Sequence, residues 1–222
     1  MAAAQSPSSQ SPDPSFLPPE DQPGLPRVLL IGDSISIGYT LPVRELLKGK
    51  ANVHRIPVLA TTTKHTLEQF DAWIGNARWD VIHFNWGLHD LRRMPDGNPQ
   101  ISLSDYEKNL RLLVDRLRPL GRRLIWCSTT PVPGTELDPP RFNDDVIAYN
   151  AIARRVMAEN RIPVDDLYAF VVPQADRIRK PLNVHFTPKG CIVLAQQVAR
   201  CISQVLASEA DGTPERPDQS AR

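Results

Sequence analysis

Short apolar runs alternate with amphipathic stretches along most of this 222-residue chain. The first run, "RVLLI" at residues 27–31, is bounded by Pro26 and Gly32. Runs of the same kind follow at 52–58, 79–86, 122–130 and the start of 162–171. A continuous apolar strand is typical of a sheet that is buried on both faces. Because helical stretches separate these runs, the pattern predicts an α/β fold, a three-layer α/β/α sandwich with a roughly five-stranded parallel sheet.

The predicted helices lie between these strands, at 41–49, 67–75, 104–120, 144–161 and 187–207. The 104–120 helix begins with Ser104 three residues before Glu107, which is a capping-box pattern. The last helix has Thr187 as its expected N-cap and Pro188 at its first position. Right-handed crossovers bring the carboxyl ends of parallel strands to one edge of the sheet, where ligands bind in such folds.

Composition narrows the possible classes of function. The formal net charge is +1, which argues against a broad basic surface for nucleic acid. No apolar run approaches the roughly 20 residues that cross a bilayer, so no membrane span is expected. The three cysteines (Cys127, Cys191 and Cys201) form neither a disulfide framework nor a CxxC metal pattern, and free thiols are the simplest interpretation.

The sequence predicts one folded domain over 27–207 between two disordered ends. Residues 1–26 contain seven prolines and lack the basic and apolar regions of a signal peptide. Residues 208–222 are polar and disordered in character. A soluble, cytoplasmic protein is therefore expected, with secretion left open, and the sequence predicts no oligomeric state.

The first predicted strand ends in Gly32-Asp33-Ser34, and three known motifs fail to fit this turn. A dinucleotide fingerprint needs G-x-G-x-x-G and a P-loop needs G-x-x-x-x-G-K-[ST], and both patterns are absent. The nucleophile elbow G-x-S-x-G is nearly spelled by "GDSIS", but Ser36 replaces the last glycine.

Three stretches in order do form a coherent set: "GDS" at 32–34, "FNWGLHDL" at 84–91 and "VHFTPKG" at 184–190. Together they resemble the SGNH/GDSL hydrolase (esterase/lipase) family across most of the predicted domain. The resemblance implies a flavodoxin-like sheet layout and an ester hydrolase that needs no cofactor and no metal.

The resemblance assigns Ser34 as the nucleophile and His185 as its base. A serine hydroxyl is unreactive alone and needs a base within hydrogen-bond distance. His185 would take the Ser34 proton and later return it to the leaving group. Asp33 is interpreted as a turn and helix-start residue. The alternatives are that Ser34 is an ordinary helix N-cap and His185 an ordinary loop histidine.

The chain departs from the family pattern at the triad acid. That acid lies three residues before the histidine, where this chain has Leu182. A leucine cannot accept the imidazole Nδ1–H. Asn183 is neutral and would substitute only in part, and Asp176 is a more distant candidate. Either a Ser34–His185 dyad works with a backbone carbonyl orienting the ring, or activity is reduced, since losing this carboxylate costs about 10⁴ in kcat in other enzymes.

The family also implies donors for an oxyanion. The Ser34 N–H is the first. The family block N-x-G is missing from "PVLATTTKHT", where Ala60 could still donate its backbone N–H. In the G-x-N-D block His89 replaces the asparagine and could donate from its ring, and Asn85 offers a second amide. Ordinary loop hydrogen bonding is the alternative for His89 and Asn85, and Asp90 is expected to hold the turn.

The other histidines are interpreted as structural, because His54 and His83 lie inside predicted strands. His83, His89 and Asp90 could be drawn as a metal set, but one loose cluster gives weak support and no metal is predicted. Trp86 is expected in the core or along a substrate cleft.

The sequence therefore predicts a serine esterase that cleaves an acyl ester through an acyl-enzyme on Ser34. The expected partner is a small-molecule or carbohydrate ester, such as an O-acetylated carbohydrate or a short acyl ester. Two alternatives stay open. A non-catalytic binding protein of the same fold is suggested by the missing acid at Leu182, and an acyltransferase could use the same residues.

Overall fold

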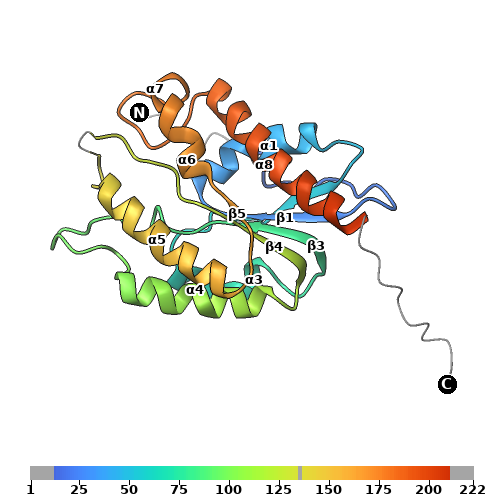
Figure 1. Ribbon diagram of the computed structural model, residues 1–222, viewed down its shortest axis with the longest axis horizontal. Helices are drawn as coiled ribbons and strands as arrows, with labels where there is room; N and C mark the ends of the chain where they lie inside the picture. Colours follow the sequence, from blue (N-terminus) through green and yellow to red (C-terminus); the bar gives the residue numbers. More distant parts are fainter. Residues whose placement is uncertain (1–12, 135–136, 211–222) are drawn as a thin grey trace, which may run out of the picture.

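The computed structural model describes residues 13–134 and 137–210, which form three layers (Figure 1). A five-stranded parallel sheet in the order β2-β1-β3-β4-β5 makes the middle layer. Its strands are β1 (Arg27–Ile31), β2 (Asn52–Arg55), β3 (Trp79–Phe84), β4 (Gly121–Cys127) and β5 (Val164–Asp165). The predicted fold class is confirmed, and the strand order is the flavodoxin-like one.

Helices cover both faces of this sheet. They are α1 (Ser34–Leu46), α2 (Thr63–Glu68), α3 (Phe70–Trp73), α4 (Leu103–Leu117), α5 (Asn143–Glu159), α6 (Leu167–Val171), the short 3-10 helix η1 (Val172–Gln174), α7 (Ala175–Ile178) and α8 (Pro188–Ala210). On one face α1 packs against α8, with α6 and α7 beside them. On the other face α4 packs against α5 and α2, with α3 nearby (Figure 1).

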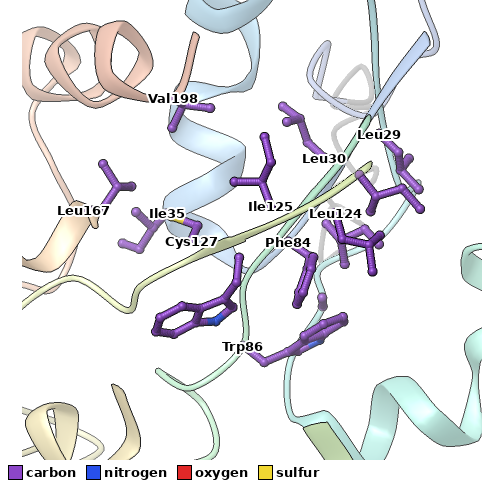
Figure 2. Packing of buried hydrophobic residues seen from close by; sticks show 14 of the residues in the cluster. Leu29, Leu30, Ile35, Phe84, Trp86, Leu124, Ile125, Cys127, Leu167 and Val198 are labelled. Atoms are coloured by element: carbon purple, nitrogen blue, oxygen red, sulfur yellow. The ribbon is translucent and has the colours of Figure 1, made fainter. Parts of the chain in front are cut away.

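The strands are buried on both faces, as their apolar sequences predicted. Residues 28–31 of β1 are all buried. Leu30 and Ile125 point to the same side of the sheet as Val198 of α8, whereas Phe84 points to the opposite side (Figure 2). Each strand thus contributes to two apolar layers, which explains why the strand sequences lack a polar alternation.

Several predicted helix boundaries are wrong, and two of them lie in the helices that cover one face of the sheet. The 67–75 stretch does not form one helix, because α2 ends at Glu68 and α3 begins at Phe70. The N-cap of α4 is Ser102 rather than Ser104. Ser102 Oγ accepts from the Asp105 N–H at 3.1 Å and donates to Asp105 Oδ2 at 2.8 Å. The capping-box spacing occurs twice in this stretch, and these hydrogen bonds select the earlier copy.

The segment before β1 is not a disordered lead over its described part. Residues 13–26 lie against the domain, and the Ser15 side chain is buried. Arg44 of α1 donates to the Ser15 carbonyl at 3.1 Å. Asn52 of β2 accepts from the Gln22 N–H at 2.9 Å and donates to the Gln22 carbonyl at 3.0 Å. The proline-rich composition suggested disorder, and these side chains from later elements hold the described part of the segment against the domain.

The last helix, α8, extends beyond its predicted end at 207. Thr187 caps it as predicted, since Thr187 Oγ1 accepts from the Gly190 N–H at 3.0 Å. Its buried side chains recur at helical spacing and include Leu194, Ala195, Val198 and Ile202. By length and composition 188–208 could cross a membrane, and here 33% of its most apolar window is buried within the fold. Residues 1–12 and 211–222, at the two predicted disordered ends, lie outside the described residues.

The strand order of the sheet reverses between β1 and β3. The chain leaves β1 for the edge strand β2 and then returns past β1 to β3. Ligands bind at such a reversal point, outside the carboxyl ends of the strands. The predicted nucleophile follows β1 and the "FNWGLHDL" block follows β3, so both lie at this edge.

Candidate active site

The turn between β1 and α1 presents Ser34 as the first residue of the helix. Asp33 is the N-cap and accepts the Ile35 N–H at 2.9 Å, which fits its predicted helix-start role. Ser36 Oγ donates to the Asp33 carbonyl at 2.7 Å, and α1 thus begins well before its predicted start at 41. The first N–H groups of a helix have no intrahelical acceptor, and the helix end favours negative charge. Ser34 therefore stands where an anion is stabilised.

Arg55 of β2 holds this turn from behind, and the sequence interpretation did not include it. Its buried guanidinium donates to Ser36 Oγ at 2.6 Å and to the Gly32 carbonyl at 2.9 Å. Phe16 covers the guanidinium, with 5.2 Å between the guanidinium carbon and the ring centroid. Burial lowers the pKa of Arg55 to about 10, so the side chain stays charged at neutral pH. The sequence did carry one sign of this role, because Arg55 is a charged residue within a strand that was predicted to be buried.

His185 lies against the nucleophile. Its Nε2 is 2.8 Å from Ser34 Oγ, although the two residues are far apart in the sequence. His185 follows α7 and precedes α8, and its carbonyl accepts from the Lys180 N–H at 2.8 Å. Burial lowers the pKa of His185 below its usual value of 6.5, so the ring is neutral at pH 7. A neutral imidazole within hydrogen-bond distance of a serine is suited to act as its base.

Asn183 takes the position that orients this imidazole. Its Oδ1 accepts from His185 Nδ1 at 2.7 Å and from the His185 backbone N–H at 3.0 Å. A backbone N–H only donates, so it fixes which end of the amide faces His185. Nδ1 must then carry the proton, and Nε2 is left as the acceptor that faces Ser34.

The other candidates for the orienting role lie elsewhere. Leu182 is 71% exposed, with a left-handed φ of 51°. Asp176 is exposed on α7 and lines a neighbouring groove with Arg179. The expected backbone carbonyl is replaced by the Asn183 amide oxygen, which orients the ring without supplying a negative charge.

Two of the four predicted oxyanion donors meet at the nucleophile. Ser34 and the His89 side chain line the same pocket as His185. Burial lowers the pKa of His89, with the Asp33 carboxylate acting in the opposite direction. A neutral imidazole can still donate one N–H to an oxyanion.

The other two donors are engaged in holding the sheet edge together. The Ala60 N–H donates to the Gly32 carbonyl at 3.2 Å. The Asn85 amide donates to the Cys127 carbonyl at 2.7 Å and to Thr129 Oγ1 at 3.3 Å. Neither residue lines the pocket in front of Ser34. The structure thus does not bring Ala60 and Asn85 together with the predicted catalytic pair, because backbone carbonyls compete for their N–H groups.

A pocket of about 300 Å³ opens in front of the nucleophile. Its lining includes Ser34, Leu88, His89, Leu137, Asp138, Pro139, Arg141, Leu182, Asn183, Val184 and His185. An adjoining groove of about 410 Å³ shares Leu137 and Arg141 with it, and Pro133, Pro140 and Phe142 make that groove mainly apolar. A small ester has room to place its carbonyl beside Ser34 and its remainder along this surface.

Comparison with known proteins decides the family. The model of the GDSL-like lipase/acylhydrolase family matches residues 30–191, which include Ser34, His89, Asn183 and His185. The chain belongs to the GDSL-like lipase/acylhydrolase family. This membership makes it a carboxylic ester hydrolase by class. A search of the curated proteins returned no match.

Solved structures with the same fold include a lipase/acylhydrolase and two acetylxylan esterases. A lipase/acylhydrolase from Enterococcus faecalis superimposes with a TM-score of 0.69 at 21% identity, covering 81% of this chain and 96% of its own. The acetyl xylan esterase AlAXEase gives a TM-score of 0.68 at 16% identity, covering 79% and 99%. The acetylxylan esterase Axe2 from Geobacillus stearothermophilus gives 0.65 at 20% identity, covering 79% and 93%. At these identities the likeness describes the fold.

Asp90, the last residue of the G-x-N-D block, holds a turn, as its sequence position suggested. Its Oδ1 accepts from the Thr63 N–H at 2.9 Å and from Thr63 Oγ1 at 2.6 Å. The carboxyl is fully buried, and burial raises its pKa to about 7. Trp86 is also buried, and its Nε1–H donates to Thr66 Oγ1 at 2.8 Å. Trp86 therefore packs in the core (Figure 2) and does not line the pocket.

Three buried side chains could supply metal ligands, and they are not the set drawn from the sequence. His83, Cys127 and Asp165 lie within the sheet with their ligand atoms inside 4.8 Å of one another. His83 Nε2 is 3.0 Å from Asp165 Oδ2, which makes a buried hydrogen-bonded pair. His83 thus belongs to a different network from Asp90, and this cluster does not line the pocket in front of Ser34.

Proposed function

We propose that this protein hydrolyses short acyl esters through an acyl-enzyme on Ser34. The observation that carries the proposal is the chain of contacts from Ser34 Oγ to His185 Nε2 at 2.8 Å and from His185 Nδ1 to Asn183 Oδ1 at 2.7 Å. This arrangement has the parts of a nucleophile, a base and an orienting group. The Cys-His-Asn proteases use a neutral asparagine in the same position of a triad.

In the proposed reaction Ser34 Oγ attacks the ester carbonyl while His185 Nε2 takes its proton. The negative charge that develops on the carbonyl oxygen is stabilised by the Ser34 N–H and the His89 ring N–H. The intermediate collapses, the bond to the alcohol oxygen breaks, and the imidazolium gives its proton to the departing alcohol. A water molecule then repeats the attack on the acyl-enzyme, with His185 as base, and releases the carboxylic acid.

The neutral Asn183 shapes the expected substrate range. It orients the imidazole but does not stabilise the imidazolium that forms in the transition state. Esters whose leaving groups depart easily need the least help from this charge, so we expect them to react best. O-acetylated carbohydrates belong to the proposed substrate class, a choice supported by the names of two acetylxylan esterases of the same fold.

The test is hydrolysis of p-nitrophenyl acetate by the wild-type protein beside Ser34→Ala and His185→Ala, with fluorophosphonate labelling followed by intact mass. Turnover by the wild type, a label on Ser34 and background activity in both variants would support the proposal. A wild-type protein that folds but neither labels nor turns over would refute it.

Position 182 holds a leucine where the family has an acid, and this favours a second candidate function, a non-catalytic binding protein of the same fold. That candidate predicts no labelling and a carbohydrate or acyl ligand that binds without being consumed. If the wild type labels but transfers its acyl group to an added alcohol faster than to water, the acyltransferase alternative is correct instead.

A further inference from the structure

We propose that Arg141 selects ester substrates that carry a negatively charged group close to the scissile bond. This inference rests on the proposed function, because it names the class of ester that the same pocket takes. It concerns binding and specificity, and it leaves the chemistry at Ser34 unchanged.

Arg141 is held at the pocket wall by the backbone. Its Nε donates to the Leu88 carbonyl at 2.9 Å, and its Nη1 donates to the Pro139 carbonyl at 3.1 Å. These neutral carbonyls fix the side chain without neutralising its charge. Arg141 lines the pocket in front of Ser34 and is half-buried. A preoriented arginine with uncompensated charge is well suited to bind a carboxylate or phosphate.

No carboxylate of the described residues lies within 4.0 Å of the Arg141 guanidinium. Arg93, nearby in sequence, shows the contrast, because it binds both oxygens of Asp145 at 2.9 and 2.6 Å. Asp138 also lines the pocket but is exposed and remains beyond that distance. Arg141 and Asp138 are therefore the two charged side chains that line this pocket, and neither has an ion-pair partner within 4.0 Å among the described residues.

Lys180 adds a second positive charge near the catalytic pair. Besides burial, which is the main cause, the charges of Lys180 and Arg141 lower the pKa of His185. The buried Asp33 carboxylate, which is the N-cap of α1, opposes them. Because Asn183 is neutral, the orienting position places no negative charge beside the pocket that would repel an anionic substrate.

The experiment compares two matched aryl acetates, 4-acetoxybenzoate and its methyl ester, by the rate of acetate release. We expect the wild-type kcat/KM to favour the anionic ester by roughly tenfold or more, the scale of a hydrogen bond to a charged group. Arg141→Gln should reduce this ratio to near one, and Arg141→Lys should keep part of it. Added salt should lower the wild-type ratio, because the pocket is open to solvent.

Arg177→Gln is the matched control, since it removes one positive charge from an exposed position on α7. It should leave the ratio unchanged. A wild-type ratio near one, or an equal loss of ratio in Arg177→Gln, would overturn the proposal even if the protein proves to be an active esterase.

Binding to the Ser34→Ala variant separates this inference from the proposed function. Calorimetric titration with 4-acetoxybenzoate and its methyl ester should show tighter binding of the anion, lost in the Ser34→Ala, Arg141→Gln double variant. If the wild type hydrolyses neither of these esters nor p-nitrophenyl acetate, the esterase proposal fails, and this titration still decides whether Arg141 recognises the anion. Equal affinity for the two compounds would contradict it.

Discussion

Asn183 makes two hydrogen bonds to His185 through one oxygen, at 2.7 Å to Nδ1 and at 3.0 Å to the backbone N–H. The second bond determines the first, because an asparagine side chain can accept from a backbone N–H only through its carbonyl oxygen and never through its NH₂ group. The asparagine is thereby prevented from turning its NH₂ group toward the ring, which would force the unproductive tautomer. A neutral residue keeps the geometry of a triad while omitting its charge.

Replacing Asn183 with aspartate should restore that charge. We expect Asn183→Asp to raise kcat by roughly tenfold to a hundredfold, because the carboxylate stabilises the imidazolium through a charge-assisted hydrogen bond. Asn183→Ala should lower kcat instead. Leu182→Asp is the control at the family's usual acid position, and its effect should be smaller, since this side chain is 71% exposed. A larger gain from Leu182→Asp would show that the orienting site has been misplaced.

The pH dependence of kcat/KM should report His185. Burial lowers its pKa below 6.5, and the base must be neutral to accept the Ser34 proton. Activity on a neutral ester should therefore persist as the pH falls past 6.5 and decline only below it. In Asn183→Asp the new carboxylate favours the charged ring, so this acidic limb should move to higher pH. A wild-type midpoint above 6.5 would be incompatible with the buried histidine described above.

His89 should act on the transition state rather than on substrate binding. His89→Ala should reduce kcat by about 10²- to 10³-fold with little change in KM, the effect of removing one oxyanion donor. Asn85→Ala offers a comparison at the same strand end, because Asn85 donates to the Cys127 carbonyl instead. Its main effect should be a free energy of unfolding lower by about 1–3 kcal/mol, measured in denaturant. If His89→Ala instead lowered stability and Asn85→Ala lowered kcat, Asn85 would be the oxyanion donor and His89 the structural residue.

Asp90 should make the protein less stable at alkaline pH. Its pKa is raised from 3.8 to about 7 in the folded state. The stabilising contribution of the protonated form is complete below pH 3.8 and is lost as the pH rises through about 7, a change of about 4 kcal/mol over the whole range. Asp90→Asn keeps an oxygen for Thr63 and removes the charge. Denaturant unfolding at pH 5 and pH 8.5 should show a large decrease for the wild type and a small one for Asp90→Asn. Parallel decreases would contradict this account.

The fold was accessible from the sequence because apolar runs and their spacing determine a parallel sheet directly. Ser34 and His185 were found through short motifs at the two ends of the domain, and the structure brings them to 2.8 Å. The orienting residue was not settled in advance, because residues 182 and 183 are adjacent. The structure places Leu182 at the surface with a left-handed φ and turns Asn183 toward His185.

The sequence could not show which of the predicted N–H donors are free to bind an oxyanion, and the physical reason is the same for Ala60 and Asn85. An N–H is available to a ligand only if no backbone carbonyl lies nearer, and this depends on contacts between distant segments. Ala60 is bound to Gly32 and Asn85 to Cys127. The same reason explains why Arg55 was missed, because its role comes from hydrogen bonds to Ser36 in α1 and to Gly32 in the turn after β1.

The position of Phe16 over Arg55 has a practical consequence for anyone producing this protein. A truncated protein that begins at Arg27, where the first strand starts, would lack Phe16. The Arg55 guanidinium, which holds the turn before Ser34, would then lose the aromatic ring that covers it. The trimmed protein could keep its sheet and still lose activity, and an assay on it would be read as evidence against catalysis. Affinity tags are better placed before residue 13 or after α8, so that the segment from Asp13 to Pro26 is kept and retains its contacts with the domain.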